Sequence, residues 1–144
     1  MNDLKPPQSE LIKLLEYFKD EKNKEAEILA LSITEKFPNH SFSWKVLGSV
    51  LRRLGRVSEA LDSNQKAVEL SPNDAEALSN FGNNLSNLGR LVEAEKSYRK
   101  AIELKSDFSS VHFNLGNLLK SQGRLKEAKE SFIRAIDLKP DFAT

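Results

Sequence analysis

The sequence predicts an all-α solenoid of antiparallel helix pairs, and two observations support this prediction. Glycines recur every 34 residues at Gly48, Gly82 and Gly116, and a second glycine follows seven residues later in each copy. Between residues 75–108 and 109–142, 16 of 34 positions are identical. A fixed period of this length is typical of like units that stack and contact only their neighbours. This architecture excludes most enzyme folds.

Each copy is expected to form two helices, as residues 75–108 illustrate. Apolar side chains before Gly89 recur at three- and four-residue steps, which predicts one helix. Gly89 ends it, because glycine readily takes the left-handed backbone conformation that follows helices. A second periodic run over 91–104 predicts the partner helix. Pro72 and Pro140 follow the same run in the sister copies, where proline prevents the helix from continuing.

The most N-terminal copy is divergent, because Leu14 and Glu21 stand where the other copies have glycine. Tyr17, Ala26 and Pro38 keep the pattern, so we still expect a helix pair there. The first unit of a stack has no preceding neighbour, which permits such divergence. The expected helix pairs lie near residues 8–37, 41–71, 75–105 and 109–138. The sequence thus predicts one domain over 7–144, with repeats at 7–40, 41–74, 75–108 and 109–142, after an N-terminal tail at 1–6.

The recurring residues resemble the signature of the tetratricopeptide repeat (TPR). In that family a Trp/Leu-x-x-Leu-Gly-x-x-Tyr/Leu helix is followed by Ala, an aromatic residue, Ala and Pro. Asn64 departs from the signature, because the family has an aromatic residue there. The resemblance implies a right-handed superhelix whose first helices line a concave groove for proteins or extended peptides. The matching residues are Trp44, Leu47, Gly48, Leu51, Ala60, Ala67 and Pro72, then Leu78, Phe81, Gly82, Leu85, Ala94, Tyr98 and Ala101, then Leu115, Gly116, Leu119, Ala128, Phe132, Ala135 and Pro140.

Two further features bear on the length of the natural protein. Residues 44–61 are similar to bacterial TPR regions that are fused ahead of glycosyltransferase or sulfotransferase domains. Ala143 stands where a fifth repeat would begin, so the array stops near a repeat boundary. Both features favour a fragment or targeting region of a longer bacterial protein.

Composition and charge argue against several other classes of function. The 22 basic and 21 acidic residues leave a net charge of +1, whereas nucleic-acid binders usually carry a basic excess. The sequence has no apolar run long enough to span a membrane and no cysteine, so we expect a cytoplasmic protein. His40 and His112 lack metal-ligand spacing, and the glycines occur singly rather than in a phosphate-binding loop. We therefore expect no enzyme activity, cofactor or metal site.

The groove that the resemblance implies changes along the array from basic and apolar to amide-rich. Asn80 and Asn114 share one repeat position, and Asn83 and Asn117 share another. An amide both donates and accepts hydrogen bonds, so this pattern, which resembles the asparagine ladder in the TPR region of O-GlcNAc transferase, is suited to hold a peptide backbone. Alternatively, the asparagines are solvated family residues without a role. The predicted peptide-binding residues are Lys45, Ser49, Arg52, Asn80, Asn83, Asn87, Phe113, Asn114, Asn117 and Lys120.

These observations favour a non-catalytic scaffold that binds a protein or an extended peptide. The alternative is an assembly module that stacks on copies of itself or on an adjacent domain. The last predicted helix has no successor to cover its apolar side chains, and such patches mark interaction surfaces. A homodimer through this C-terminal helix would bury the patch on both copies. The residues predicted for this contact are Phe132, Ile136, Leu138 and Phe142.

Overall fold

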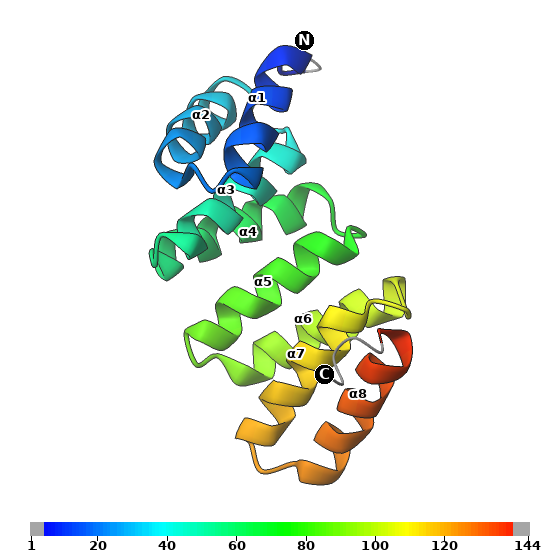
Figure 1. Cartoon of the computed structure of the whole chain (residues 1–144). Coiled ribbons are helices and arrows are strands. Elements are labelled where there is room, and N and C mark those ends of the chain that lie inside the picture. The colour runs from blue at the N-terminus through cyan, green and yellow to red at the C-terminus, as the bar shows by residue number, and fades with distance from the viewer. Residues whose placement is uncertain (1–4, 140–144) are drawn as a thin grey trace. The chain divides into compact units, whose positions relative to one another are not determined.

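The computed structural model describes residues 5–139, and it is all-α within that range (Figure 1). The chain forms two compact units, an N-terminal unit of residues 1–72 and a C-terminal unit of residues 73–144. Each unit holds two antiparallel helix pairs, which confirms the predicted fold class. The ends of these pairs differ from the expected ones by at most one residue. The helices of the described part are α1 (Gln8–Lys19), α2 (Asn23–Lys36), α3 (Ser41–Arg53), α4 (Val57–Leu70), α5 (Ala75–Asn87), α6 (Leu91–Leu104), α7 (Ser109–Ser121) and α8 (Leu125–Leu138).

The turn inside each pair has the same backbone form in all four repeats. Gly89 has a φ of 78°, and the next amide, that of Arg90, donates to the carbonyl five residues back at 2.9 Å. This arrangement satisfies carbonyls that the end of a helix leaves open. Glu21 keeps the left-handed conformation at a φ of 57°, and the Lys22 amide donates to the carbonyl of Tyr17 at 2.8 Å. The divergent first pair therefore retains the turn without its glycine.

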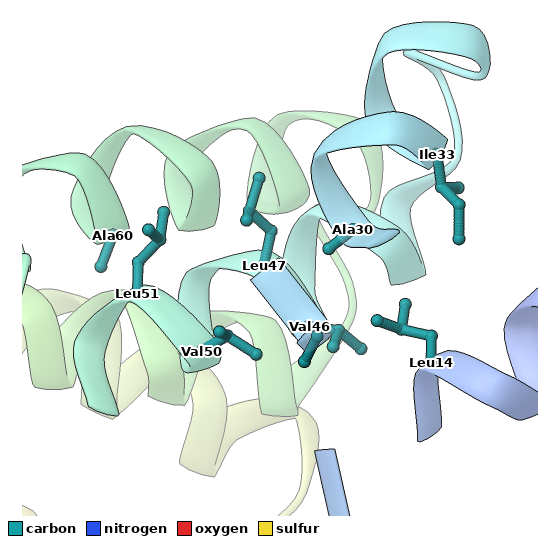
Figure 2. Close-up of a cluster of buried hydrophobic side chains, with 9 residues drawn as sticks. Leu14, Ala30, Ile33, Val46, Leu47, Val50, Leu51 and Ala60 are labelled. Carbon is teal, nitrogen blue, oxygen red and sulfur yellow. The ribbon is translucent and has the colours of Figure 1, made fainter. Parts of the chain in front are cut away.

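The N-terminal unit is built around an apolar cluster to which all four of its helices contribute. Helix α2 packs against both α1 and α3. Figure 2 shows Leu14 of α1 pointing toward Ile33 of α2 and Val46 of α3. The buried cluster comprises Leu14, Ala26, Ala30, Ile33, Val46, Leu47, Val50, Leu51 and Ala60.

One close approach inside each pair explains the small residues of the repeat. A Cβ added to Gly82 would come within 2.8 Å of the Tyr98 ring, and one added to Gly116 within 2.7 Å of the Phe132 ring. The glycine on the first helix therefore makes room for the aromatic ring on the second. In the first pair the sizes are exchanged, because Leu14 stands at the glycine position and Ala30 at the aromatic position.

Asn64 breaks this rule in the second pair. Its amide lies against Gly48, where the sister repeats have a ring. The residue is 1% exposed, and neither its Nδ2 nor its Oδ1 has a hydrogen-bond partner among the described residues. An unpaired buried amide costs free energy, so Asn64 is a less favourable neighbour for Gly48 than an aromatic ring would be.

Ion pairs join the second helices of neighbouring pairs within each unit. In the N-terminal unit, Arg56 pairs with Glu27 of α2 and with Glu59. In the C-terminal unit, Arg124 pairs with Glu95 of α6 at 2.7 Å and with Glu127 at 2.8 Å. These ion pairs supplement the apolar packing of α2 on α3 and of α6 on α7.

Candidate binding faces

The residues predicted to bind peptide lie on α3, α5 and α7, which are the first helices of their pairs. We define two faces, one in each unit: the α1–α3 face by exposed and half-buried residues at six repeat positions, and the α5–α7 face by the residues predicted to bind peptide. The α1–α3 face comprises Gln8, Leu11, Ile12, Leu15, Phe18 and Lys19 of α1 with Phe42, Lys45, Ser49, Arg52 and Arg53 of α3. The α5–α7 face comprises Asn80, Asn83 and Asn87 of α5 with Phe113, Asn114, Asn117 and Lys120 of α7.

Two of the predicted asparagines meet on the α5–α7 face. The Nδ2 of Asn114 donates to the Oδ1 of Asn83 at 3.1 Å, and the Tyr98 hydroxyl donates to the same oxygen at 2.6 Å. Three helices therefore converge on one amide. Within the described part of the chain, the Asn83 Nδ2 and the Asn114 Oδ1 make no hydrogen bond. The pair thus retains the Asn83 Nδ2 and the second N–H of Asn114 as donors, and the Asn114 Oδ1 as an acceptor, on a half-buried surface.

The other predicted residues of this face surround that pair. Asn80 is half-buried, and the Phe113 ring packs edge-on against the Phe132 ring at a centroid distance of 5.6 Å. Because Phe132 also covers Gly116, its ring packs α8 against α7 at two positions. The exposed residues of the face are Asn87, Asn117 and Lys120.

The α1–α3 face has a different chemistry. The Lys45 ammonium lies 5.6 Å from the centroid of the Phe42 ring. Ser49 is half-buried and Arg52 is exposed. No residue of this face is acidic, so the face combines cationic and apolar side chains.

Sequence reasoning missed the residues of α1 on this face because the first repeat is divergent. Ile12 is 51% exposed and Leu15 is 45% exposed. The guanidinium carbon of Arg53 lies 3.7 Å from the centroid of the Phe18 ring, and its Nη1 donates to the Phe18 carbonyl at 2.7 Å. Counting the binding positions of the later repeats back by 34 residues would have found Ile12, Leu15 and Phe18.

Neither histidine forms part of a recognisable catalytic or metal site. His40 precedes α3, where its Nδ1 lies 2.7 Å from the Ser43 hydroxyl and burial lowers its pKa. The Nε2 of His112 lies 3.0 Å from the Ser106 carbonyl. Within residues 5–139, no cluster of three or more His, Asp or Glu side chains could hold a metal ion.

The structure places three of the four residues predicted for self-association. The Phe132 ring lies over Gly116, Ile136 is 38% exposed, and Leu138 is half-buried. Phe142 lies outside the described residues. Ile133 and Leu125 of the same helix are also exposed, at 48% and 64%. Helix α8 therefore presents apolar side chains beyond those that the sequence singled out.

The described residues contain no helix with both the length and the apolar character that crossing a membrane requires.

The fold and these faces define an all-α repeat protein of four helix pairs. Family models for the tetratricopeptide repeat match residues 14–75, 64–96 and 109–142, and one described as TPR repeat matches 82–123. The chain is therefore a tetratricopeptide repeat protein, as the sequence predicted. A comparison with curated proteins finds no match.

Solved structures with the same fold include YrrB, described as a TPR protein with an unusual peptide-binding site. YrrB is 31% identical, with a TM-score of 0.79 over 87% of this chain and 64% of its own. A crystal structure of MamA is 23% identical, with a TM-score of 0.81 over 88% of this chain and 74% of its own. MamA 41-end from Desulfovibrio magneticus RS-1 is 20% identical, with a TM-score of 0.84 over 94% and 77%. At these identities the likeness to MamA supports the fold alone.

Proposed function

We propose that this chain is a non-catalytic scaffold that binds a protein or an extended peptide on the faces of its first helices. The hydrogen-bonded pair of Asn83 and Asn114 carries the proposal. A peptide backbone presents alternating carbonyl acceptors and amide donors. The Asn83 Nδ2 and the Asn114 Oδ1 supply the complementary groups. The likeness to YrrB, whose description names a peptide-binding site, supports the same function.

Tyr98 supports this function by fixing the amide of Asn83. Because the Asn114 Nδ2 donates to the Asn83 Oδ1, rotating the Asn83 amide alone by a half turn would set donor against donor. The Tyr98 hydroxyl adds a second hydrogen bond to the same oxygen, and the two bonds together favour one orientation of the Asn83 amide. Preorganised groups bind more tightly, because less conformational entropy is lost on binding.

Two sets of variants test the proposal with arrays of random synthetic peptides. We expect Asn83→Asp to weaken binding, because an aspartate still accepts both internal hydrogen bonds but cannot donate to a peptide carbonyl. The double variant Asn83→Ala/Asn114→Ala should weaken binding further, by about 2- to 10-fold for each hydrogen bond removed. Gln65→Ala on α4 is the matched control, since it removes an exposed amide from a second helix. Unchanged binding by the double variant, with a native circular dichroism spectrum, would refute the role of the asparagines.

A second function, self-association, is favoured by the exposed side chains of α8. Leu125, Ile133 and Ile136 are each more than one third exposed. Removing apolar surface from water contributes about 25 cal/mol per Å², and a second copy of the same helix could cover this surface. Ile136→Glu should abolish a dimer that light scattering detects at high concentration. A wild-type chain that remains monomeric would exclude this function.

A further inference from the structure

The α1–α3 face holds an arginine that is fixed in place without a carboxylate. The guanidinium of Arg53 stacks on the Phe18 ring, and its Nη1 is held by the Phe18 carbonyl. Stacking on an aromatic ring and a hydrogen bond at one nitrogen restrict a side chain that is otherwise flexible. Arg53 therefore bridges the ends of α1 and α3 in a defined orientation.

Arg53 differs from most other arginines in the described chain because it has no acidic partner there. Arg56, Arg90, Arg99 and Arg124 each pair with at least one glutamate. Within residues 5–139, Arg53 pairs with no carboxylate, and the side chain is exposed. Its Nε and Nη2 remain available, and guanidinium groups bind carboxylates through two parallel hydrogen bonds. Arg53 thus has the geometry of a preformed carboxylate site.

An apolar stripe on α1 leads to this arginine. Leu15 lies one helical turn before Phe18, and Ile12 lies one turn before Leu15. Both side chains are about half exposed. Leu15 stands at the repeat position of Ser49, which is half-buried on α3, and Ile12 stands at that of Val46, which is buried there.

The charge around the stripe favours an acidic partner. None of the residues that form the α1–α3 face is acidic, whereas Lys19 and Arg53 are both exposed. Glu16 lies on the flank of the stripe. A negatively charged segment would therefore meet complementary charge at the Arg53 end and apolar surface at the Ile12 end.

We propose that the α1–α3 face binds a peptide segment of another protein that carries an apolar side chain two or three residues from a carboxylate. The carboxylate binds Arg53, and the apolar side chain packs on Ile12 and Leu15. Ile12 and Phe18 are separated by about 9 Å along the helix axis, which about three residues of an extended peptide cover. This inference rests on the proposed peptide-binding function and adds a ligand class and a second subsite to it.

Peptide arrays test the proposal directly. In the first array, the Glu array, each peptide carries one Leu and one Glu at a fixed separation, in either order, and all other positions are random. The second array, the Gln array, is identical except that Gln replaces Glu. We expect the Glu array to bind best at a separation of two or three residues. Arg53→Gln should weaken that binding by about 10-fold or more but leave the Gln array unchanged. Arg53→Lys should restore it only in part, because lysine keeps the charge without the planar fork.

Controls separate this proposal from the broader function. Leu15→Ser should weaken both arrays, whereas Arg134→Gln, at an exposed arginine of α8, should weaken neither. Emission from Trp44, the sole tryptophan, verifies that the N-terminal unit remains folded. If Arg53→Gln binds the Glu array like the wild type while Asn83→Ala/Asn114→Ala loses binding, this inference is wrong and the proposed function stands. If the wild type binds no peptide of any array, both are wrong.

Discussion

Tyr98 of α6 and Asn64 of α4 share one repeat position in the two units. The Tyr98 side chain is long enough to reach the α5–α7 face, whereas the Asn64 side chain ends against Gly48. Tyr98 crosses over Gly82 and donates to Asn83. Asn64 lies against Gly48, and neither of its amide atoms has a hydrogen-bond partner within residues 5–139. The residue at this position of the second helix therefore determines whether a polar side chain of the first helix receives a hydrogen bond from within the pair.

The two faces differ in chemistry although their helices share one backbone pattern. The α5–α7 face presents amides, and the α1–α3 face presents apolar and cationic side chains. Apart from Leu11, Phe18 and Phe42, which pack against the apolar core, and Phe113, which packs on Phe132, the face positions lie outside the core, so their side chains can vary with little loss of packing. The same repeat can therefore carry two chemically unlike surfaces in one chain.

The largest expected effect is on the free energy of unfolding, when Tyr98 and Asn64 are each replaced by alanine. Tyr98→Ala should lower the free energy of unfolding by about 3–5 kcal/mol, as for other buried aromatic residues. Asn64→Ala should change it by no more than about 1 kcal/mol, because the weaker packing against Gly48 is offset by removing an amide with no hydrogen-bond partner. Urea denaturation followed by circular dichroism measures both. Equal decreases in the free energy of unfolding would mean that Tyr98 and Asn64 contribute equally to stability.

A smaller effect is expected at the ion pairs that join α6 to the last helix pair. Glu95 accepts hydrogen bonds from Arg124 and Arg99. Glu95→Gln should lower the free energy of unfolding by about 1.5–3 kcal/mol. Glu93→Gln is the matched control, since its exposed ion pair with Arg90 should contribute little to the free energy of unfolding. Urea denaturation followed by circular dichroism gives both values.

The same ion pairs should make the C-terminal unit sensitive to acid. The hydrogen bond from Arg124, followed by the one from Arg99, lowers the pKa of Glu95 below the ordinary value of 4.5. A carboxylate with a depressed folded pKa contributes stability that is present above the unfolded value and disappears as the pH falls through the folded one. Glu95→Gln should therefore flatten the pH dependence of the circular dichroism midpoint below pH 4.5. Trp44 reports only on the other unit, so an equal change in its emission would contradict the distinction between the units.

The smallest effect concerns the left-handed residue in the turns. Glu21 and Gly89 occupy equivalent positions with φ values of 57° and 78°. Left-handed backbone costs a residue with a Cβ roughly 1–2 kcal/mol. Glu21→Gly should therefore raise the free energy of unfolding by up to about 1 kcal/mol, while Gly89→Ala should lower it by a similar amount. Thermal unfolding of both variants measures the difference, and a destabilising Glu21→Gly would mean that Glu21 makes a compensating interaction.

Helix positions were predictable because spacing alone determines them. The glycines and the apolar periodicity located the last three helix pairs, the 34-residue period located the first, and the repeat register placed Asn83 and Asn114 on one face. The role of Tyr98 was not predictable, since it depends on how far a side chain reaches across two helices. Arg53 stands out in the sequence only as a basic residue, because its stacking on Phe18 involves a divergent repeat in which the glycine signals are missing.

The hydroxyl of Tyr98 has a consequence for the direction in which a bound chain runs. A polypeptide is not symmetric, because its carbonyl and amide groups follow in a different order when the sequence is reversed. With its Oδ1 occupied, Asn83 offers a ligand only donors, whereas Asn114 offers its Oδ1 and its second N–H. A strand that accepts from Asn83 and donates to Asn114 meets these groups in a different register when its direction is reversed. By occupying Oδ1, a phenol on another helix would in this way bias the direction of a bound chain.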